Sequence, residues 1–357
     1  MQVKILKLTN KLITIHSTKE DTQALDNILT IANNHLKEYK SKKFQNKSVP
    51  SIIYYNTPKL PKKFRIILNA HLDVVPAKES QYKPLVKGDK LYGRGAQDMK
   101  GAATVEILVF KELASKVNYP LGLQLVTDEE VGGFNGAKHQ VEKGIRADFV
   151  IAGEPTDFGV NNKAKGIVWA KLFTKGKTAH GAYTWQGENA INKMNDVINA
   201  IKTKYSIPKK EAWETTVNLA KVLTNNETFN KVPDYCEAWL DIRYIPEESE
   251  TIVKQLKSTL AKDVELELEL KEPSQYTDEN NQYIKHLRKS VKNITGKIPP
   301  VINKHGGSDI RHFNAVGCDG VTFGPIGEGL HTDNEWVSIK SLETYYKILK
   351  DFLLSVN

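Results

Sequence analysis

Three acidic residues stand side by side at 128–130, within the stretch LGLQLVTDEEVGG. The apolar run before them predicts a buried strand, so Asp128, Glu129 and Glu130 follow directly on a strand end. Adjacent like charges repel, and burial makes their ionised forms costlier still unless a cation lies among them. The stretch therefore points to chemistry that combines carboxylates with a positive charge.

Other residues of metal-ligand type occupy similar places in the sequence. His71 and Asp73 follow the apolar run FRIILNA, and Glu154 follows the run ADFVIAG. Asp98 lies just before a predicted helix, and His331 follows GVTFGPIGEG near the C-terminus. The carboxyl ends of parallel strands meet at one edge of a sheet, so we expect these side chains to gather there. Two imidazoles with several carboxylates form a donor set suited to zinc, cobalt or manganese.

Each of these residues also has an ordinary structural interpretation. Asp98 could cap the helix that follows it, and Thr127 with Glu130 fits an S/T-x-x-E capping box. Glu154 could be a turn residue before Pro155, and the two histidines could belong to a core. Five such coincidences at strand ends compete poorly with one metal cluster. A cluster also explains the adjacent acids, because metal cations neutralise them.

The hydrophobic periodicity predicts strands that alternate with helices over the first part of the chain. Helices are predicted at 4–15, 22–39, 99–116 and 135–144, and strands at 51–55, 64–70, 121–127 and 147–153. This alternation predicts an α/β fold with a mostly parallel sheet and helices on both faces.

The pattern changes at about residue 164. Strands are predicted at 165–176, 214–223, 235–243 and 263–270, and helices at 187–204 and 248–261. Four strands with two helices predict a compact α+β unit of the ferredoxin-like type. An amphipathic helix at 337–356 returns to the earlier pattern. We therefore predict a first domain in two segments, 1–163 and 274–357, with a second domain inserted at 164–273.

Composition narrows the class of protein without naming a substrate. The 357 residues are 40% hydrophobic and 26% charged, which is typical of a globular protein. A net charge of +9 would suit nucleic acid, an acidic membrane surface or an anionic small molecule. The lysines are spread along the whole chain and no nucleic-acid-binding motif occurs, so we expect a solvated basic surface and no nucleic-acid partner.

The cysteines and the N-terminal stretch bear on the compartment. Cys236 and Cys318 lack CxxC spacing, which favours buried thiols over a disulfide framework. The stretch MQVKILKLTNKLITIHST has charges every few residues and no apolar core, unlike a signal peptide. No run is long enough to span a membrane. We expect a cytoplasmic protein without a membrane partner.

Five motifs make the chain recognisable, and they occur in the order AHLDVVP, GRGAQDMKGA, TDEEVGG, GEPT and HTDNEW. Together they resemble the dizinc amidohydrolase family of acetylornithine deacetylase, succinyl-diaminopimelate desuccinylase, aminoacylase and bacterial glutamate carboxypeptidase. The resemblance covers nearly the whole chain, including an insertion where that family has its lid. It implies a zinc-exopeptidase-like catalytic domain with a ferredoxin-like lid or dimerisation domain.

The resemblance implies a role for each candidate ligand. Asp98 matches the carboxylate that bridges two metal ions. His71 and Glu154 would complete the coordination of one ion, and Glu130 and His331 that of the other. The implied cofactors are two Zn²⁺ ions, with Co²⁺ or Mn²⁺ as substitutes.

Two further features of the metal centre follow from the same resemblance. Asp73, two residues after His71, would accept the ring N–H of that histidine and so fix its tautomer. The peptide bond between Asp98 and Met99 is implied to be cis, as is common in the family.

Glu129 is the general base that the resemblance implies. Adjacent side chains diverge, so Glu129 would not share a metal ion with Glu130 and would face the water between the metals. It would take a proton from that water and hand it to the leaving amine. In the stretch GKTAHGAYTWQGENAI, His180 resembles the family's oxyanion donor, which in dimeric members reaches across from the partner subunit. Thr184 stands where the family often has proline.

Candidate substrate-binding residues come from two further stretches. NKVPDYCEAWLDIRYIP resembles a segment that binds a substrate carboxylate, here through Asn230 and Arg243. The preceding residues lack the paired glycines usual in the family. HGGSDIRHF resembles a glycine-rich substrate loop, in which Gly307 and Ser308 would present donors to a carboxylate. Asp309 and Arg311 of that loop are assigned no role.

The implied activity is metal-dependent hydrolysis of the amide bond in an N-acyl amino acid, as in a deacetylase or desuccinylase. A dipeptidase or carboxypeptidase would use the same dizinc site, and the sequence separates these alternatives poorly. A non-catalytic metal-binding protein would have lost the base or a ligand, and none is missing. We expect a small N-acyl amino acid or short peptide as substrate, and a homodimer.

Overall fold

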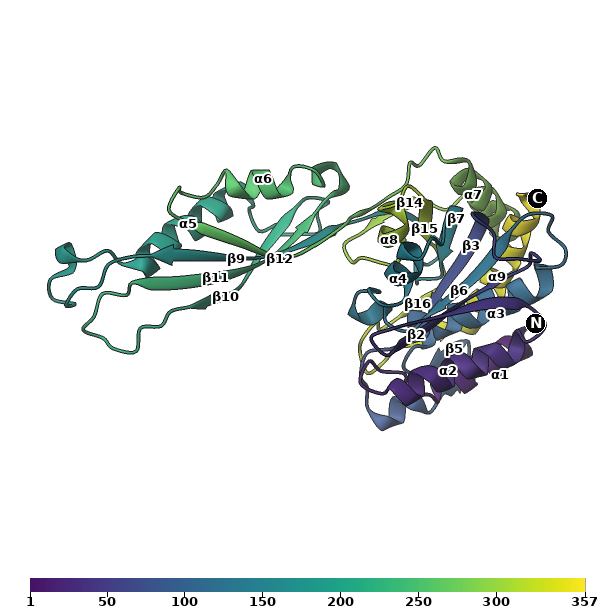
Figure 1. The fold of residues 1–357 in the computed structure, drawn as a ribbon. Helices are drawn as coiled ribbons and strands as arrows, with labels where there is room; N and C mark the ends of the chain where they lie inside the picture. Colours follow the sequence, from purple (N-terminus) through teal and green to yellow (C-terminus); the bar gives the residue numbers. More distant parts are fainter. Residues whose placement is uncertain (357) are drawn as a thin grey trace. The chain divides into compact units, whose positions relative to one another are not determined.

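The computed structural model describes residues 1–356 and divides the chain into two compact units. The first unit comprises residues 1–163, 276–303 and the chain from 308 onward. The second comprises residues 164–275 and 304–307. Each unit has its own central sheet (Figure 1). The hydrophobic cores of the two units are also separate.

A nine-stranded sheet forms the centre of the first unit. Its strands are β1 Lys40–Asn46, β2 Val49–Tyr55, β3 Phe64–His71, β6 Leu121–Val126, β7 Ala147–Ala152, β8 Val160–Ala164, β13 Gln275–Tyr276, β14 Val301–Lys304 and β15 Asp319–Thr322. The order is β1-β2-β6-β3-β7-β15-β8-β13, and β14 pairs with β8. The four central strands from β6 to β15 are parallel, whereas β1, β2 and β8 pair antiparallel. The predicted α/β fold with a parallel central sheet is confirmed.

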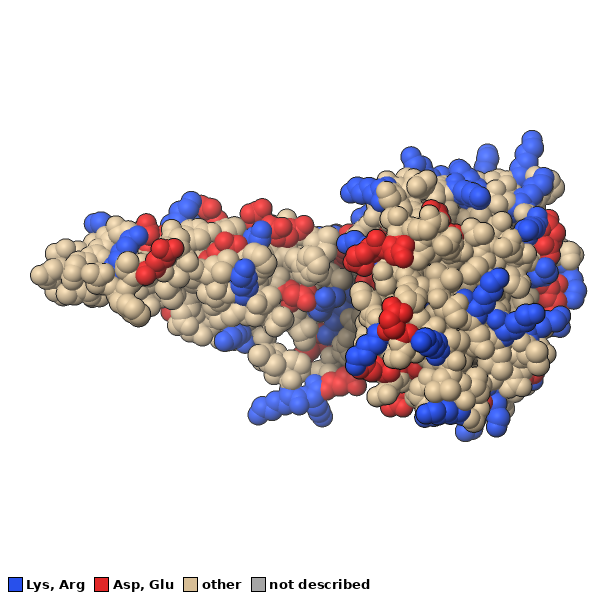
Figure 2. Space-filling view, turned by 90° about the horizontal axis from the view of Figure 1, so that it is seen from below, with Lys and Arg blue, Asp and Glu red and all other residues tan. Residues whose placement is uncertain are grey.

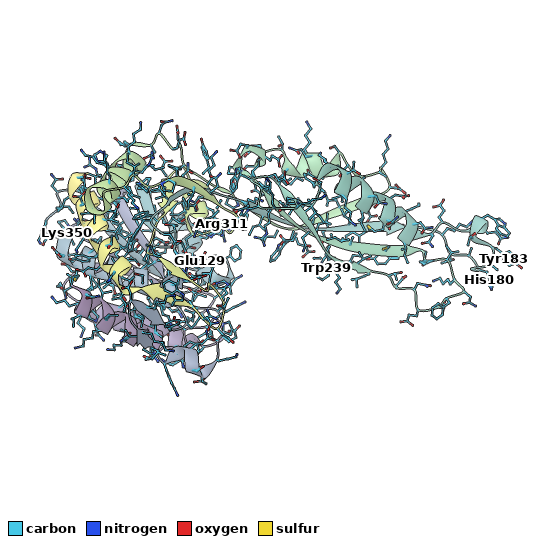
Figure 3. All side chains as sticks on the ribbon, turned by 180° about the vertical axis from the view of Figure 1, so that it is seen from behind. Glu129, His180, Tyr183, Trp239, Arg311 and Lys350 are labelled. Atoms are coloured by element: carbon cyan, nitrogen blue, oxygen red, sulfur yellow. The ribbon has the colours of Figure 1, made fainter. Side chains whose placement is uncertain are left out.

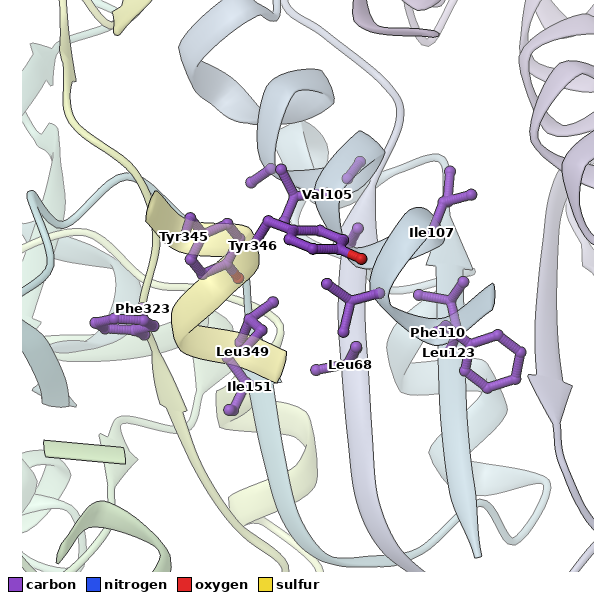
Figure 4. Packing of buried hydrophobic residues seen from close by; sticks show 14 of the residues in the cluster. Leu68, Val105, Ile107, Phe110, Leu123, Ile151, Phe323, Tyr345, Tyr346 and Leu349 are labelled. Carbon is purple, nitrogen blue, oxygen red and sulfur yellow. The ribbon is translucent and has the colours of Figure 1, made fainter. Parts of the chain in front are cut away.

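Helices cover both faces of this sheet, because its central strands are apolar on both faces. Along β3, Ile66 and Leu68 point into the larger core and Ile67 into a second core on the opposite face. The larger core includes side chains of α1 Gln2–Ile13, α2 Thr22–His35, α3 Gly101–Leu113, α7 Gln282–Thr295 and α9 Ile339–Ser355. Figure 4 labels members of this core from α3 and α9 and from the strands β3, β6 and β7. The second core includes side chains of α4 Ala137–Glu142 and α8 Ile310–Asn314. Because helices pack on both faces, the ends of the central strands are held in fixed positions.

The second unit has the predicted ferredoxin-like arrangement. Its elements are, in order, β9 Gly166–Lys175, α5 Ala190–Lys204, β10 Thr216–Leu223, β11 Tyr235–Tyr244, α6 Ile252–Lys257 and β12 Glu265–Glu272. The strands form one antiparallel sheet in the order β10-β11-β9-β12. Val168, Ala170 and Leu172 of β9 are buried in a core with α5 and α6, while Trp169 points to the opposite, more exposed face.

A third, small sheet brings two distant segments of the first unit together. It consists of β4 Leu85–Lys87, β5 Lys90–Tyr92, β16 Gly327–Glu328 and β17 Trp336–Ser338. Its central pair joins β5, which precedes Asp98, to β17, which follows His331. These strands are too short for their periodicity to predict them, yet they place the Asp98 and His331 segments side by side.

The structure differs from the predicted elements after the second helix. That helix ends at His35 rather than at 39, and the next residues form the edge strand β1. Phe44 is the only fully buried side chain of β1, so the strand shows no clear apolar alternation. Lys47 and Ser48 join β1 to β2 with φ values of 46° and 66°, the conformation that two-residue hairpin turns require.

Two further observations concern the cysteines and the helices. Cys236 and Cys318 are both free and buried, as predicted. Within residues 1–356, no helix combines the length and the apolar character needed to cross a bilayer.

Candidate metal centre and active site

Three of the five candidate ligands, together with Glu129, stand at the carboxyl ends of three adjacent strands. His71 is the last residue of β3, Glu129 and Glu130 follow β6, and Glu154 follows β7. β3 lies between β6 and β7 and is parallel to both, so all three strands end at the same edge of the sheet. The strand order therefore gathers these side chains.

Two groups of donor atoms lie at this edge, and they share Asp98. In the first group, His71 Nε2 lies 2.8 Å from Asp98 Oδ1 and 3.6 Å from Glu154 Oε1. In the second, His331 Nε2 lies 3.3 Å from Asp98 Oδ2 and 3.0 Å from Glu130 Oε2. The structure thus brings all five candidate ligands together, with one oxygen of Asp98 facing each group.

The chemistry of these donors fits a pair of divalent cations. Each group offers one imidazole nitrogen and two carboxylates, with donor atoms within 4.8 Å of one another. Although burial opposes it, hydrogen bonding to Asp73 and Asp98 raises the pKa of His71 well above its usual value. Hydrogen bonds to Asp98 and Glu130 raise the pKa of His331 to about 10. Surroundings that favour a proton on each imidazole also favour a metal cation in its place.

Asp73 contacts both His71 and the turn that follows β6. Its carboxylate accepts hydrogen bonds from the backbone N–H groups of Glu129 and Glu130, at 3.2 and 3.0 Å. His71 Nδ1 lies 3.1 Å from the backbone carbonyl of Asp73 and 3.6 Å from its carboxylate. The carbonyl is therefore the closer acceptor for the ring N–H, and the carboxylate mainly holds residues 128–133, called here the acidic turn. Sequence reasoning missed this contact, which spans 56 residues.

Glu335 holds the turn that carries Asp98. The peptide bond after Asp98 is cis, as the family resemblance predicted. The carboxylate of Glu335 accepts backbone hydrogen bonds from Gly95, Gln97 and Asp98, at 3.1, 2.9 and 3.1 Å. It also lies 2.6 Å from Arg94 Nη1. Glu335 belongs to the quoted motif HTDNEW, yet nothing in that motif signals a cap on a turn this distant in sequence.

Replacement of Glu335 by alanine is expected to lower the free energy of unfolding by about 3–5 kcal/mol, because it leaves a buried arginine unpaired. Arg94 and Glu335 are 3% and 2% exposed, so water cannot replace the missing partner. Urea denaturation of the parent and the variant measures the difference.

Asp148→Ala is the matched control for that measurement. Asp148 pairs with Lys63 at the same distance of 2.6 Å, but both side chains are exposed. We expect this exposed pair to contribute only about 0–1 kcal/mol. An equal decrease in the free energy of unfolding of the two variants would show that burial does not increase the contribution of the Arg94–Glu335 pair.

Glu129 directly precedes Glu130 and is close enough to His71, Asp98 and Glu154 to interact with their charges, yet it belongs to neither donor group. Burial, then the charges of Glu154 and Asp98, raises the pKa of Glu129 well above its usual value, although His71 and Arg311 act in the opposite direction. Figure 3 labels Glu129 and Arg311 in the first unit. A carboxylate with raised proton affinity beside metal donors is suited to accept a proton.

His180 and Asn230 lie side by side in the second unit. The Gly181 N–H, next to His180, donates to the carbonyl of Asn230 at 2.7 Å. His180 is exposed, and its ring lies 5.6 Å from the ring of Tyr183, which Figure 3 also labels. His180 and Asn230 thus lie on two exposed loops that are hydrogen-bonded to each other.

Arg243 lies on β11 of the same unit and already has a carboxylate partner. Its guanidinium donates two hydrogen bonds to Asp241, at 2.9 and 3.2 Å. Trp169 Nε1 donates to the same carboxylate at 3.2 Å. A substrate carboxylate would therefore have to compete with Asp241 for Arg243, or share it.

Gly307 and Ser308 fall on opposite sides of the boundary between the units. Ser308 is 3% exposed, and its hydroxyl accepts a hydrogen bond from the backbone N–H of Ile310 at 3.3 Å. This contact satisfies the N–H of the first residue of α8, a structural task that the glycine-rich pattern alone does not reveal.

This fold and these donor groups define a metal-dependent hydrolase. A family model described as Peptidase family M20/M25/M40 matches residues 67–355, and the chain belongs to that family. The match confirms the resemblance stated from the sequence motifs.

Relatives and solved structures agree with this assignment. An uncharacterized metallohydrolase of Methanocaldococcus jannaschii is 28% identical, over 90% of this chain and 88% of that protein. A succinyl-diaminopimelate desuccinylase of Helicobacter pylori is 30% identical, over 78% of this chain and 77% of that protein. Aminopeptidase PepT from Bacillus cereus superposes with a TM-score of 0.83 at 18% identity, covering 100% and 99% of the two chains. At that identity the structural likeness concerns the fold.

Proposed function

We propose that this protein hydrolyses the amide bond of N-acyl amino acids in a metal-dependent reaction. The observation that carries the proposal is the position of Glu129 near two donor groups that share Asp98. The desuccinylase from Helicobacter pylori supports an acyl group as the part removed, since it is similar over most of both chains.

In this proposal, His71, Asp98 and Glu154 would hold one Zn²⁺ ion, and Asp98, Glu130 and His331 would hold the other, with Co²⁺ or Mn²⁺ as substitutes. Divalent ions at such sites make water acidic enough to lose a proton near neutral pH and polarise a carbonyl oxygen. The chain's own contribution is to keep the five donors within reach of one another.

Glu129 moves the proton in the proposed reaction. Its carboxylate takes a proton from the attacking water and later donates that proton to the nitrogen of the leaving amine. His180 donates a hydrogen bond to the carbonyl oxygen as negative charge develops there. The amide C–N bond breaks, which leaves a carboxylic acid and an amine.

We assign the carboxylate end of the substrate to Asn230 and Arg243, with Gly307 and Ser308 as further donors. Arg243 presents the bidentate guanidinium fork that suits a carboxylate. Asp241 holds that fork in a defined orientation through two hydrogen bonds.

Hydrolysis of short peptides is the second candidate. The solved structures of similar fold include an aminopeptidase, a tripeptidase of Staphylococcus aureus and a carboxypeptidase of Sulfolobus solfataricus. The bond cleaved is an amide in both cases, so the same metal centre and base would serve. The residues that contact the acyl or amino-terminal part decide between the two.

A substrate panel with and without chelator tests the proposal. We expect the zinc-loaded protein to cleave an N-acyl amino acid, such as N-succinyl-diaminopimelate or N-acetylornithine, and to lose that activity when chelator removes the metal. Added zinc should restore it. Cleavage of dipeptides alone would favour the peptidase alternative. No cleavage across the panel, with two metal ions bound, would contradict both.

We further propose a homodimer in which His180 completes the active site of the partner subunit. Mixing Glu129→Gln chains with His180→Ala chains should then restore about a quarter of parent activity, since half of randomly mixed dimers are heterodimers with one complete site. Each variant alone serves as the control. No recovery in verified heterodimers would place His180 within its own chain's site or outside the reaction.

The surface charge supports a small-molecule substrate over nucleic acid. Figure 2 shows Lys and Arg interspersed with Asp and Glu on the face that it draws, without one continuous basic stripe. The two free thiols suit a reducing compartment, and we propose the cytoplasm.

A further inference from the structure

Asp309 is a buried carboxyl group that the proposed reaction does not use. It lies at the start of α8 and is 1% exposed. Its Oδ2 accepts a hydrogen bond from Asn69 Nδ2 at 3.3 Å, whereas its Oδ1 has no hydrogen-bond partner within residues 1–356. Asn69 belongs to β3, two residues before His71. Asp309 is therefore tied to the strand that ends in a candidate metal ligand.

Three more buried side chains hold the amide of Asn69. Asn69 Nδ2 also donates to Gln124 at 2.8 Å, Gln124 donates to Gln140 at 3.0 Å, and Gln140 donates to Ser51 at 2.9 Å. All four side chains are 2% exposed or less. Rotating any one of the three side-chain amides by half a turn would place donor against donor or acceptor against acceptor. The orientations of the amides in this row are therefore fixed together. The row thus presents an N–H donor to Asp309.

The acidic turn packs its backbone directly on the other oxygen of Asp309. Gly133 has a φ of 64°, and a Cβ at this position would lie 2.1 Å from Asp309 Oδ1. Only glycine fits both the conformation and the contact. The Gly133 N–H donates to the carbonyl of Asp128 at 2.7 Å, which closes the turn around Glu129 and Glu130.

Two neighbours of Asp309 on α8 hold the same turn. Arg311 Nη2 donates to the carbonyl of Gly132 at 2.7 Å, and His312 Nε2 lies 3.0 Å from the same carbonyl. The Gly132 N–H in turn donates to the carbonyl of Glu129 at 2.7 Å. The start of α8 therefore contacts the acidic turn at two consecutive residues, Gly132 and Gly133.

We propose that Asp309 is a positioning residue, which with Asn69 seats the acidic turn against β3 and so fixes Glu129 relative to His71. This inference rests on the proposed function, in which Glu129 moves the proton. Burial, then the charges of Glu129 and Asp128, raises the pKa of Asp309 well above its usual value. A neutral carboxyl group can support the turn without repelling Glu129.

Kinetics of three variants test the proposal. Asp309→Ala is expected to lower kcat about 100-fold with KM nearly unchanged and metal content intact, because a displacement of about 1 Å can cost that much. Asp309→Asn, which keeps the shape of a neutral carboxyl group, should recover most of the loss. Asn69→Ala removes the donor on the strand side and should lower kcat in the same direction.

Asp319→Ala is the matched control. Asp319 likewise accepts a hydrogen bond from an asparagine, Asn281, at 2.7 Å, but it lies at the opposite, amino end of β15. We expect it to keep the parent kcat. A folded, metal-loaded Asp309→Ala variant with parent kcat would overturn the proposal, as would an equal loss in the control.

Hydrogen exchange of the acidic turn gives a readout that needs no substrate. The backbone amides of residues 129–133 should exchange about tenfold faster in Asp309→Ala than in the parent or in Asp319→Ala. Unchanged exchange would overturn the positioning role. Faster exchange in a protein that cleaves nothing in the substrate panel would reject the proposed function and leave the positioning role standing.

Discussion

Replacement of Glu129 by glutamine is expected to lower kcat by about 10²–10⁴-fold, the usual contribution of a positioned proton-transfer group. Glutamine keeps the size and polarity of the side chain but cannot take up the proton. Glu129 is not among the five candidate ligands, so the variant should retain its metal ions and its stability. Steady-state kinetics measures kcat, metal analysis of the same samples measures the metal content, and urea denaturation measures the stability.

Glu130→Gln is the informative companion, because it alters the adjacent residue, which is a candidate ligand. We expect this variant to lose metal affinity as well as activity. A Glu129→Gln variant that keeps kcat within about tenfold of the parent would place the base elsewhere.

Replacement of Asp98 by alanine is expected to abolish binding of both proposed metal ions. The two oxygens of Asp98 face different donor groups, so one substitution takes a ligand from each. Loss of even an outer partner of a metal ligand costs about 10–100-fold in affinity, and loss of a shared ligand should exceed that for both ions. Metal content after gel filtration, measured by atomic emission, gives the result, and hydrolysis should disappear with the ions.

His331→Ala provides the comparison, because His331 belongs to the second group only. We expect this variant to keep one ion under conditions in which Asp98→Ala keeps none. Retention of two ions by Asp98→Ala would contradict a bridging role, and equal metal loss in both variants would show that the groups are not distinct.

The sequence predicted those parts of the fold and site that leave a local pattern. The apolar run before His71 and the run before Glu129 each mark a strand and its end, and parallel order then implies that the ends meet. The insertion was recognised in the same way, through a change of periodicity near residue 164. The cis peptide bond after Asp98 came from the family resemblance, and the structure contains it.

The parts that escaped prediction depend on contacts between polar groups far apart in the chain. Glu335 holds backbone N–H groups about 240 residues earlier, and every residue carries such a group, so no side-chain pattern reports the contact. Asp73 accepts hydrogen bonds from backbone N–H groups in the same way, whereas Asp309 packs against the backbone of Gly133. The edge strand β1 escaped for a different reason, because exposed polar residues hide its period.

The strand order also determines at which point of its synthesis the chain can complete the central sheet and the candidate metal centre. β15 lies between β7 and β8 in the sheet, although it is made long after both of them. Until residues 319–322 leave the ribosome, the central sheet is split and β7 keeps an unpaired edge, a hazard for aggregation. His331 and Glu335 emerge later still, and before then Asp98 lacks both a neighbour in the second donor group and its cap. A nascent chain therefore has no complete candidate metal centre until residues 331–335 have been made.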